Sequence, residues 1–157
     1  LTHCMRWLGL GRRALDTAPD RAGHRELFGN RLGDLGPAQE LIAQSVVDLE
    51  LCEAIIARTA SALVSDPREG SRLSSIAKVH CAEAIWRTID RAMQLCGGDG
   101  MSDALPLASF LNEVRPFRVY DGSTETHKWA IARRALSARR RQREAGEARL
   151  DIVAEHP

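Results

Sequence analysis

Two long stretches of helical periodicity constrain the fold of this chain more than any other feature. Between Ala38 and Val64, apolar residues recur every three to four positions, which places them on one face of a helix about 40 Å long. A second stretch, from about Arg72 to Cys96, repeats the pattern. Both helices must bury an apolar face, so we expect them to pack as antiparallel neighbours. The first face comprises Ile42, Val46, Leu49, Cys52, Ile56, Ala60 and Leu63, and the second comprises Ile76, Val79, Ala82, Ile85, Trp86, Ile89 and Met93.

Helix-breaking residues mark the ends of these two helices. Ser65-Asp66-Pro67 is expected to end the first, with Gly70 and Ser71 separating it from the second. The glycine-rich residues 97–100 are expected to end the second, because consecutive glycines cost too much chain entropy to continue a helix.

Shorter helices are predicted on either side of this pair. Cys4 to Thr17 can form a first helix that stops before Pro19, and residues 24–37 contain enough glycine and proline to be a loop. Leu105 to Val114 forms a helix that must end before Pro116. The last helix covers about Thr124 to Arg141 and is capped either by Thr124 with His127 or by Ser123 with Thr126.

Little in the sequence favours β-strands. Aromatic residues make up 4 % of the chain, and the good helix formers Ala, Leu, Arg and Glu dominate. The expected fold is therefore an all-α, up-down helical bundle. We expect one helical domain over residues 1–141, followed after Gly146 by a polar tail within residues 142–157.

The charge and cysteine content exclude several classes of function. The net charge is +1, so no overall field points to nucleic acid or a membrane, and the run 139–143 is expected to be a solvated helix end. Four scattered cysteines without a CxxC pair predict buried thiols in a reducing cytosol or organelle matrix, and no metal site. No apolar run is long enough to span a bilayer, and no signal peptide is visible. The chain starts without Met, which indicates a piece of a longer protein.

Three motifs in a fixed order suggest a family. Residues 25–29 (RELFG) precede the first long helix, residues 94–100 (QLCGGDG) close the second, and residues 120–125 (YDGSTE) precede the last. Over residues 1 to about 138, the chain resembles the C-terminal domain of the acyl-CoA dehydrogenases, whose motifs are R-x-x-F-G, Q-x-x-G-G-x-G and Y-E-G-T. The opening residues 3–6 (HCMR) and the Asp in place of Glu are most similar to the subgroup of family members ten and eleven.

The resemblance implies an oxidoreductase that contains FAD and converts acyl-CoA thioesters to 2-enoyl-CoA. A carboxylate removes the α proton while a β hydride passes to the flavin, and an oxyanion site stabilises the developing enolate. Carried over to this chain, Asp121 is the base, its N–H is the oxyanion donor, and Gly122 allows a tight turn beside the flavin. Because Asp is shorter than Glu, the substrate should sit differently. The chain alone should be inactive, since the other domains of the family complete the site.

Eight residues are implied in cofactor binding. Arg25 would pair with the pyrophosphate of one subunit's flavin, and Phe28 would pack near the adenine. Gln94, Gly97 and Gly98 would contact the adenosine end of the flavin in the neighbouring subunit. Ser123 and Glu125 would hydrogen-bond the adenosine half, beside Gly122. A homodimer or homotetramer is thereby implied, with an electron-transferring flavoprotein as electron acceptor.

Alternatives remain open at this level. The domain could be a non-catalytic oligomerisation scaffold of the same fold, or an unrelated helical binding module. Asp121-Gly122 on its own is an ordinary turn pair, Arg25 an ordinary solvated charge, and Gly97-Gly98 an ordinary helix stop. The three tryptophans are expected to anchor the core or an interface, and no histidine has a catalytic partner at a readable spacing.

Overall fold

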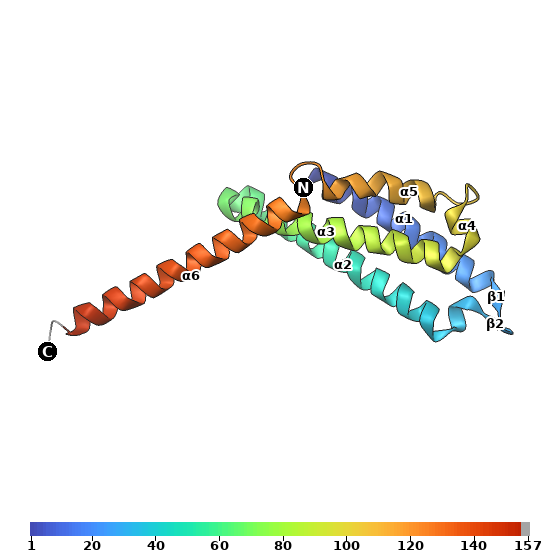
Figure 1. Ribbon diagram of the computed structural model, residues 1–157, viewed down its shortest axis with the longest axis horizontal. Helices are drawn as coiled ribbons and strands as arrows, with labels where there is room; N and C mark the ends of the chain where they lie inside the picture. Colours follow the sequence, from blue (N-terminus) through green and yellow to red (C-terminus); the bar gives the residue numbers. More distant parts are fainter. Residues whose placement is uncertain (155–157) are drawn as a thin grey trace.

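The computed structural model describes the backbone of residues 1–154 and the side chains of residues 1–145. Four helices run alternately in opposite directions (Figure 1): α1 (Thr2–His24), α2 (Gly36–Ser65), α3 (Pro67–Cys96) and α5 (Leu107–Val114). A further long helix, α6 (Thr124–Ala154), starts beside the N-terminus and projects away from the others. The all-α, up-down bundle predicted from sequence is confirmed.

Short elements connect the helices. They are β1 (Glu26–Leu27), β2 (Asn30–Arg31), the 3-10 turn η1 (Leu32–Asp34), the one-turn helix α4 (Gly98–Met101) and the 3-10 turn η2 (Arg115–Arg118). The two strands pair antiparallel where a loop was predicted. Phe28 and Gly29, which join them, both have positive φ, of 53° and 78°, as a two-residue type I′ hairpin turn requires.

Helix α1 is longer than predicted, because it continues through Pro19 to His24. Proline within a helix removes one backbone hydrogen bond and costs about 3 kcal/mol. Burial on both sides of Pro19 offsets this cost: Ala14, Ala18 and Ala22 are almost fully buried at a four-residue spacing. The expectation that Pro19 would end the helix was therefore wrong.

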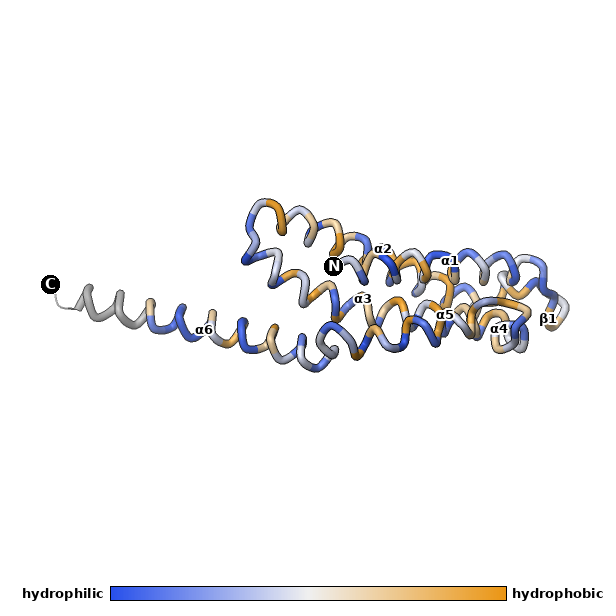
Figure 2. The backbone as a smooth tube through the Cα atoms, turned by 90° about the horizontal axis from the view of Figure 1, so that it is seen from above, coloured by the Kyte–Doolittle hydropathy of each residue, from blue (hydrophilic) through white to orange (hydrophobic). Residues whose placement is uncertain are grey.

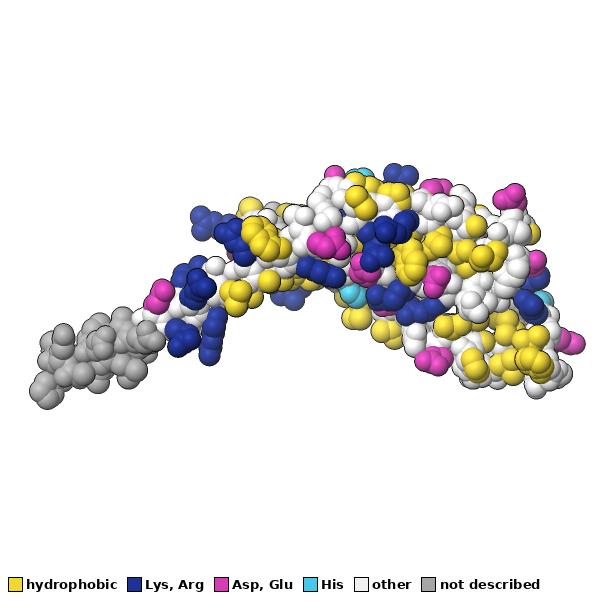
Figure 3. Space-filling model, viewed as in Figure 1, with side chains coloured by type: hydrophobic (Ala, Val, Ile, Leu, Met, Phe, Trp, Pro, Cys, Tyr) yellow, Lys and Arg dark blue, Asp and Glu magenta, His cyan; other side chains and the backbone are white. Residues whose placement is uncertain are grey.

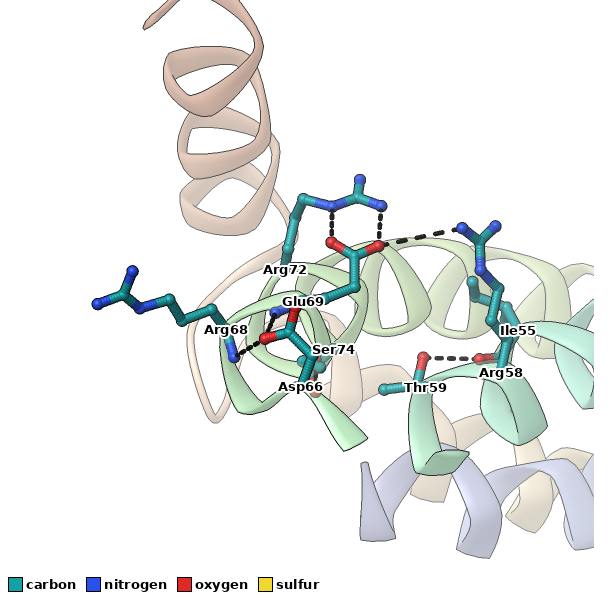
Figure 4. Close-up of polar contacts among 9 residues, drawn as sticks. Ile55, Arg58, Thr59, Asp66, Arg68, Glu69, Arg72 and Ser74 are labelled. Atoms are coloured by element: carbon teal, nitrogen blue, oxygen red, sulfur yellow. Dashed lines mark hydrogen bonds and ion pairs between the residues drawn. The ribbon is translucent and has the colours of Figure 1, made fainter. Parts of the chain in front are cut away.

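The corner between α2 and α3 is tighter than predicted (Figure 4). The Asp66 carboxylate accepts hydrogen bonds from the backbone N–H groups of Arg68 and Glu69, at 3.0 and 3.2 Å, so α3 begins at Pro67. Gly70 lies inside α3 and not in a linker, contrary to the prediction. A Cβ atom there would lie 2.7 Å from the Leu63 Cα, so only glycine lets the two helices approach this closely.

Helix α3 is the centre of the molecule and contacts α1, α2, α4, α5 and α6. Its apolar residues face other helices on several sides, and Ala77, Cys81, Ala84, Ile85 and Ile89 are wholly buried. The hydropathy of the residues agrees with the central position of α3. Apolar residues occur along the length of α3, whereas α6 is largely polar (Figure 2). All four cysteines are buried, as predicted, and none forms a disulfide with another described residue.

The buried face of α2 is more polar than predicted. Ser45, Asp48 and Thr59 are buried, whereas Val46 and Leu63 are about 40 % exposed. Asp48 accounts for much of this, because its carboxylate pairs with two arginines of α3: Arg87 at 2.8 Å and Arg91 at 2.7 Å. Burial alone would raise the pKa of Asp48, but the hydrogen bonds from both arginines outweigh it and lower that pKa.

Replacing Asp48 by Asn should lower the free energy of unfolding at pH 7 by about 2–3 kcal/mol, because two arginines lose their counter-charge. A lowered pKa in the folded state gives stability that is present above the ordinary value of 3.8 and is lost as the pH falls through the folded value. The difference between variant and wild type should therefore shrink below about pH 4 in urea titrations. Glu50→Gln, an exposed change on the same helix, is the control; an equal cost for both variants would contradict the assignment.

Helix α6 extends beyond the predicted end at Arg141 and reaches Ala154. From Lys128 to Ala145 its described side chains are exposed or only partly buried. Trp129 and Leu136 are 60 % and 63 % exposed, and hydrophobic and basic side chains alternate along the part that leaves the bundle (Figure 3). No helix within the described residues is long and apolar enough to cross a membrane.

Candidate functional site

The turn before α6 is built by a serine cap. The Ser123 hydroxyl accepts a hydrogen bond from the Thr126 N–H at 3.2 Å, which is the second of the two caps predicted. Hydrogen bonds from its own backbone N–H and from the Ser123 hydroxyl lower the pKa of Glu125. The first turn of α6 thus carries an ionised carboxylate where the helix dipole favours negative charge.

Asp121 and Gly122 form a turn with two consecutive positive φ angles, of 54° and 85°. Asp tolerates the left-handed conformation better than most residues with a side chain, and Gly adopts it freely. His127 holds the turn from the first turns of α6, since its Nε2 lies 3.1 Å from the Asp121 carbonyl oxygen. The positive φ favours glycine at residue 122, and a Cβ there would lie 3.0 Å from the same nitrogen, so the His127 ring would have to shift slightly.

Lys78, a buried lysine of α3, also holds the Asp121-Gly122 turn. Lys78 is 6 % exposed, and its ammonium donates hydrogen bonds to the carbonyls of Phe117, at 2.7 Å, and Gly122, at 3.0 Å. Burial lowers the pKa of Lys78, and the nearby Cys4, Asp121 and Glu125 counteract that shift. The Asp121-Gly122 turn is therefore fixed to the centre of the bundle despite its exposed position.

A third basic side chain reaches the Asp121 carboxylate itself. His3, in the first turn of α1, places its Nε2 2.9 Å from Asp121 Oδ2. Together with Lys78, Phe117 and His127, these two residues line a pocket of about 100 Å³, completed by Leu1, Cys4 and Ser74. None of the hydrogen bonds found among residues 1–145 engages the Asp121 N–H or its Oδ1. The Asp121 side chain is also 62 % exposed.

A second cluster of predicted residues lies at the opposite end of the bundle. Arg25, Gln94 and Gly97 line one cavity of about 260 Å³, whose other walls are mainly apolar, from Leu27, Leu32, Pro37, Ala38, Leu41 and Leu95. Gly97 ends α3 with a φ of 61°, and a Cβ there would lie 2.9 Å from Arg25 Nη1. Because residue 97 is glycine and has no side chain, there is room for the Arg25 guanidinium beside it.

The remaining two residues of this group lie outside that cavity lining. Phe28 is 87 % exposed at the tip of the β1–β2 hairpin, and Gly98 is exposed at the start of α4. The guanidinium of Arg25 makes one long hydrogen bond, 3.4 Å to the Cys96 carbonyl, which leaves most of its donors available. An arginine, an amide and apolar walls are suited to a phosphate joined to an aromatic base.

Helix α3 separates the two clusters. Lys78 marks the Asp121 end and Gly97 the Arg25 end, and at about 1.5 Å per residue these positions are about 28 Å apart along the helix. The structure therefore brings the predicted residues together as two sites and not as one. No group of three or more His, Cys, Asp or Glu residues suited to a metal occurs among the described residues.

Sequence reasoning gave no role in the site to His3, Lys78 or His127. His3 and Asp121 lie at opposite ends of the sequence, and no spacing rule connects them. Lys78 occupies a position on α3 that reads as an ordinary polar interruption of the apolar pattern. Only His127 had a local signal, because it follows Asp121 by six residues and was considered as part of a helix cap.

Comparison with known proteins gives a consistent result. Residues 1–136 match the family described as acyl-CoA dehydrogenase, C-terminal domain. Acyl-CoA dehydrogenase family member 11 of Gallus gallus is 36 % identical over 132 residues, which cover 83 % of this chain and 17 % of that protein. Among solved structures, one from Mycobacterium abscessus that is assigned to the acyl-CoA dehydrogenases has a TM-score of 0.83 at 31 % identity, covering 87 % of this chain and 34 % of that one. Glutaryl-coenzyme A dehydrogenase in its glutaryl-CoA complex has a TM-score of 0.75 at 26 % identity, covering 83 % and 33 %.

Proposed function

The chain belongs to the acyl-CoA dehydrogenase family, as its C-terminal helical domain, and we propose that it supplies the catalytic base of an FAD-dependent enzyme that oxidises acyl-CoA thioesters to 2-enoyl-CoA. The chain spans about a sixth of the length of its relative in Gallus gallus, so the activity would belong to a larger protein. We assign the domain itself to residues 1–141.

One observation carries this proposal: a carboxylate with a free oxygen stands at a rigidly held turn. Within residues 1–145, no hydrogen bond engages Asp121 Oδ1 or the Asp121 N–H, and Lys78 and His127 fix the backbone on either side of them. A thioester whose α carbon lies against Oδ1 would lose its α proton to this carboxylate. The thioester carbonyl oxygen would accept a hydrogen bond from the Asp121 N–H. This bond would stabilise the negative charge that develops on that oxygen.

The residues at both ends of the bundle fit FAD. When bound, the flavin accepts the hydride that leaves the β carbon. Gly122, Ser123 and Glu125 would contact it beside the base. At the other end of the bundle, Arg25 would pair with the phosphates of a flavin shared with the neighbouring subunit, with Phe28 close to its adenine. Gln94, Gly97 and Gly98 would contact the adenosine end of that flavin, since Gln94 and Gly97 line the same cavity as Arg25.

The test is flavin bleaching in the full-length protein. An acyl-CoA thioester should reduce the bound flavin of the wild-type protein and should fail to reduce that of the Asp121→Asn variant at a comparable rate. The isolated chain should be inactive in the same assay, because it supplies only part of the site. We propose an electron-transferring flavoprotein as the acceptor of the electrons, and a reducing compartment, in keeping with four free thiols.

A second candidate function, oligomerisation, is favoured by the exposed side of α6. Trp129 and Leu136 are seven residues apart and therefore share one face, which no other part of the described chain covers. The two cofactor clusters, about 28 Å apart along α3, also favour assembly, because two chains could then enclose each flavin. We propose a homodimer or homotetramer in which α6 packs against a neighbouring copy.

Leu136→Glu should weaken self-association by at least about tenfold, because it buries a charge within an apolar contact. Sedimentation analysis of the purified chain over a range of concentrations would measure the change. Val64→Glu alters an even more exposed apolar residue, at the end of α2, and is the control. A wild-type chain that is monomeric at every concentration would contradict the proposed role of α6.

A further inference from the structure

The contact between His3 and Asp121 involves the side chain assigned as the base, but the proposed reaction gives His3 no role. Nε2 of His3 and Oδ2 of Asp121 are 2.9 Å apart, an ordinary hydrogen-bond distance. The contact joins the first turn of α1 to the turn before α6, and the two segments lie side by side in Figure 1.

The Asp121 side chain needs such a contact, because it is otherwise free to rotate. It is 62 % exposed, and its backbone lies in a turn and not in a helix. His127 and Lys78 hold backbone carbonyls of the turn and do not reach the carboxylate. An aspartate also has one fewer rotatable bond than a glutamate and reaches less far. It therefore has less freedom to compensate for a wrong orientation.

His3 packs against two aromatic side chains, and its own side chain is 43 % exposed. Its ring makes an edge contact with Tyr120, with centroids 5.0 Å apart and planes at 64°, and it lies 6.3 Å from the Phe117 ring. The Tyr120 hydroxyl accepts a hydrogen bond of 2.6 Å from the indole N–H of Trp7, which is buried in α1. Two aromatic side chains therefore fix the imidazole, and one of them is fixed in turn by the core.

The two nitrogens of His3 have different surroundings. Nδ1 is buried and has no hydrogen-bond partner among the described residues. Nε2 faces Asp121 Oδ2, and an N–H at this position can donate to the carboxylate and orient it.

We propose that His3 is a positioning residue for the catalytic base: it holds Oδ2 of Asp121 so that Oδ1 faces the α carbon of the thioester. This inference rests on the proposed function of Asp121. It assigns His3 no contact with the substrate and no transfer of a proton. Its contribution is to restrict the carboxylate to one orientation, and misplacement by about 1 Å can cost on the order of 100-fold in rate.

Two substitutions in the full-length flavoprotein test the inference. His3→Phe keeps a ring against Tyr120 but removes the donor, whereas His3→Gln keeps an N–H donor. His3→Phe should lower the limiting rate of flavin bleaching at saturating acyl-CoA by about 10–100-fold, with the half-saturating concentration little changed. His3→Gln should restore most of the rate. His24→Phe, at the exposed end of the same helix, is the control, and flavin content and thermal stability are measured for every variant.

The outcomes separate the two claims. An unchanged rate in His3→Phe, with Asp121→Asn inactive, would overturn the role of His3 and leave Asp121 as the base. Equal slowing in His3→Phe and His3→Gln would also overturn it, because the donor would then not be what matters. An unchanged rate in Asp121→Asn would overturn the proposed function itself.

Discussion

Asp121→Asn is expected to lower the rate constant for flavin reduction by acyl-CoA by about 10³-fold, within the range of about 10²–10⁴ that general base catalysis contributes. Asparagine has nearly the same size, tolerates the positive φ of residue 121, and can still accept a hydrogen bond from His3. The substitution therefore removes the basicity of the side chain and little else. Stopped-flow recording of flavin absorbance would measure the rate.

Two further variants make this result specific. Asp103→Asn, an exposed change of the same kind, should leave the rate unaltered. Asp121→Glu restores a basic carboxylate but lengthens it by one methylene and fits the left-handed backbone less well, so it should recover only part of the rate. Retention of flavin reduction in Asp121→Asn, at normal flavin content, would leave the scaffold interpretation as the better one.

Lys78→Met should lower the free energy of unfolding of the chain by about 2–3 kcal/mol. Methionine fills a similar volume, but the carbonyls of Phe117 and Gly122 lose a charged donor, and the buried carbonyl of Phe117 is left without a partner. One opposing effect limits the loss, because the variant no longer buries an ammonium group, whose cost is expressed in the lowered pKa of Lys78. Two charge-assisted hydrogen bonds should outweigh it.

The sequence offers a matched control, since the only other lysine, Lys128, is exposed on α6. Lys128→Met should change the free energy of unfolding by less than about 0.5 kcal/mol. Urea denaturation followed by circular dichroism would measure both variants. If Lys78→Met were as stable as the wild type, the buried charge would have to cost as much as its two hydrogen bonds contribute.

The long helices could be predicted because their signals are local. A three-to-four-residue apolar repeat over Ala38–Val64 specifies a helix whatever it packs against. The errors arose where distant contacts outweigh local preference. Pro19 breaks helices in isolation, but the burial of Ala18 and Ala22 keeps α1 continuous. Gly70 suggests a linker from composition alone, whereas its lack of a side chain permits the close approach of α2 and α3.

Only part of the candidate site could be predicted from the sequence. Asp121 and Gly122 form a short motif, so a family resemblance was enough to single them out. The side chains that hold them come from α1, α3 and α6; Lys78 belongs to none of the recognised motifs, and the HCMR motif gives His3 no role at Asp121. Contacts between residues so far apart in the sequence depend on how the helices pack, and no local pattern specifies that packing.

The position of both clusters on α3 also limits how such a domain can evolve. Lys78 fixes the Asp121 turn near one end of this helix, and Gly97 adjoins Arg25 at the other. Inserting one residue between them would move one cluster by about 1.5 Å and rotate it by about 100° relative to the other. Insertions and deletions should therefore fall outside this stretch, and the length of α3 between Lys78 and Gly97 should be inherited unchanged.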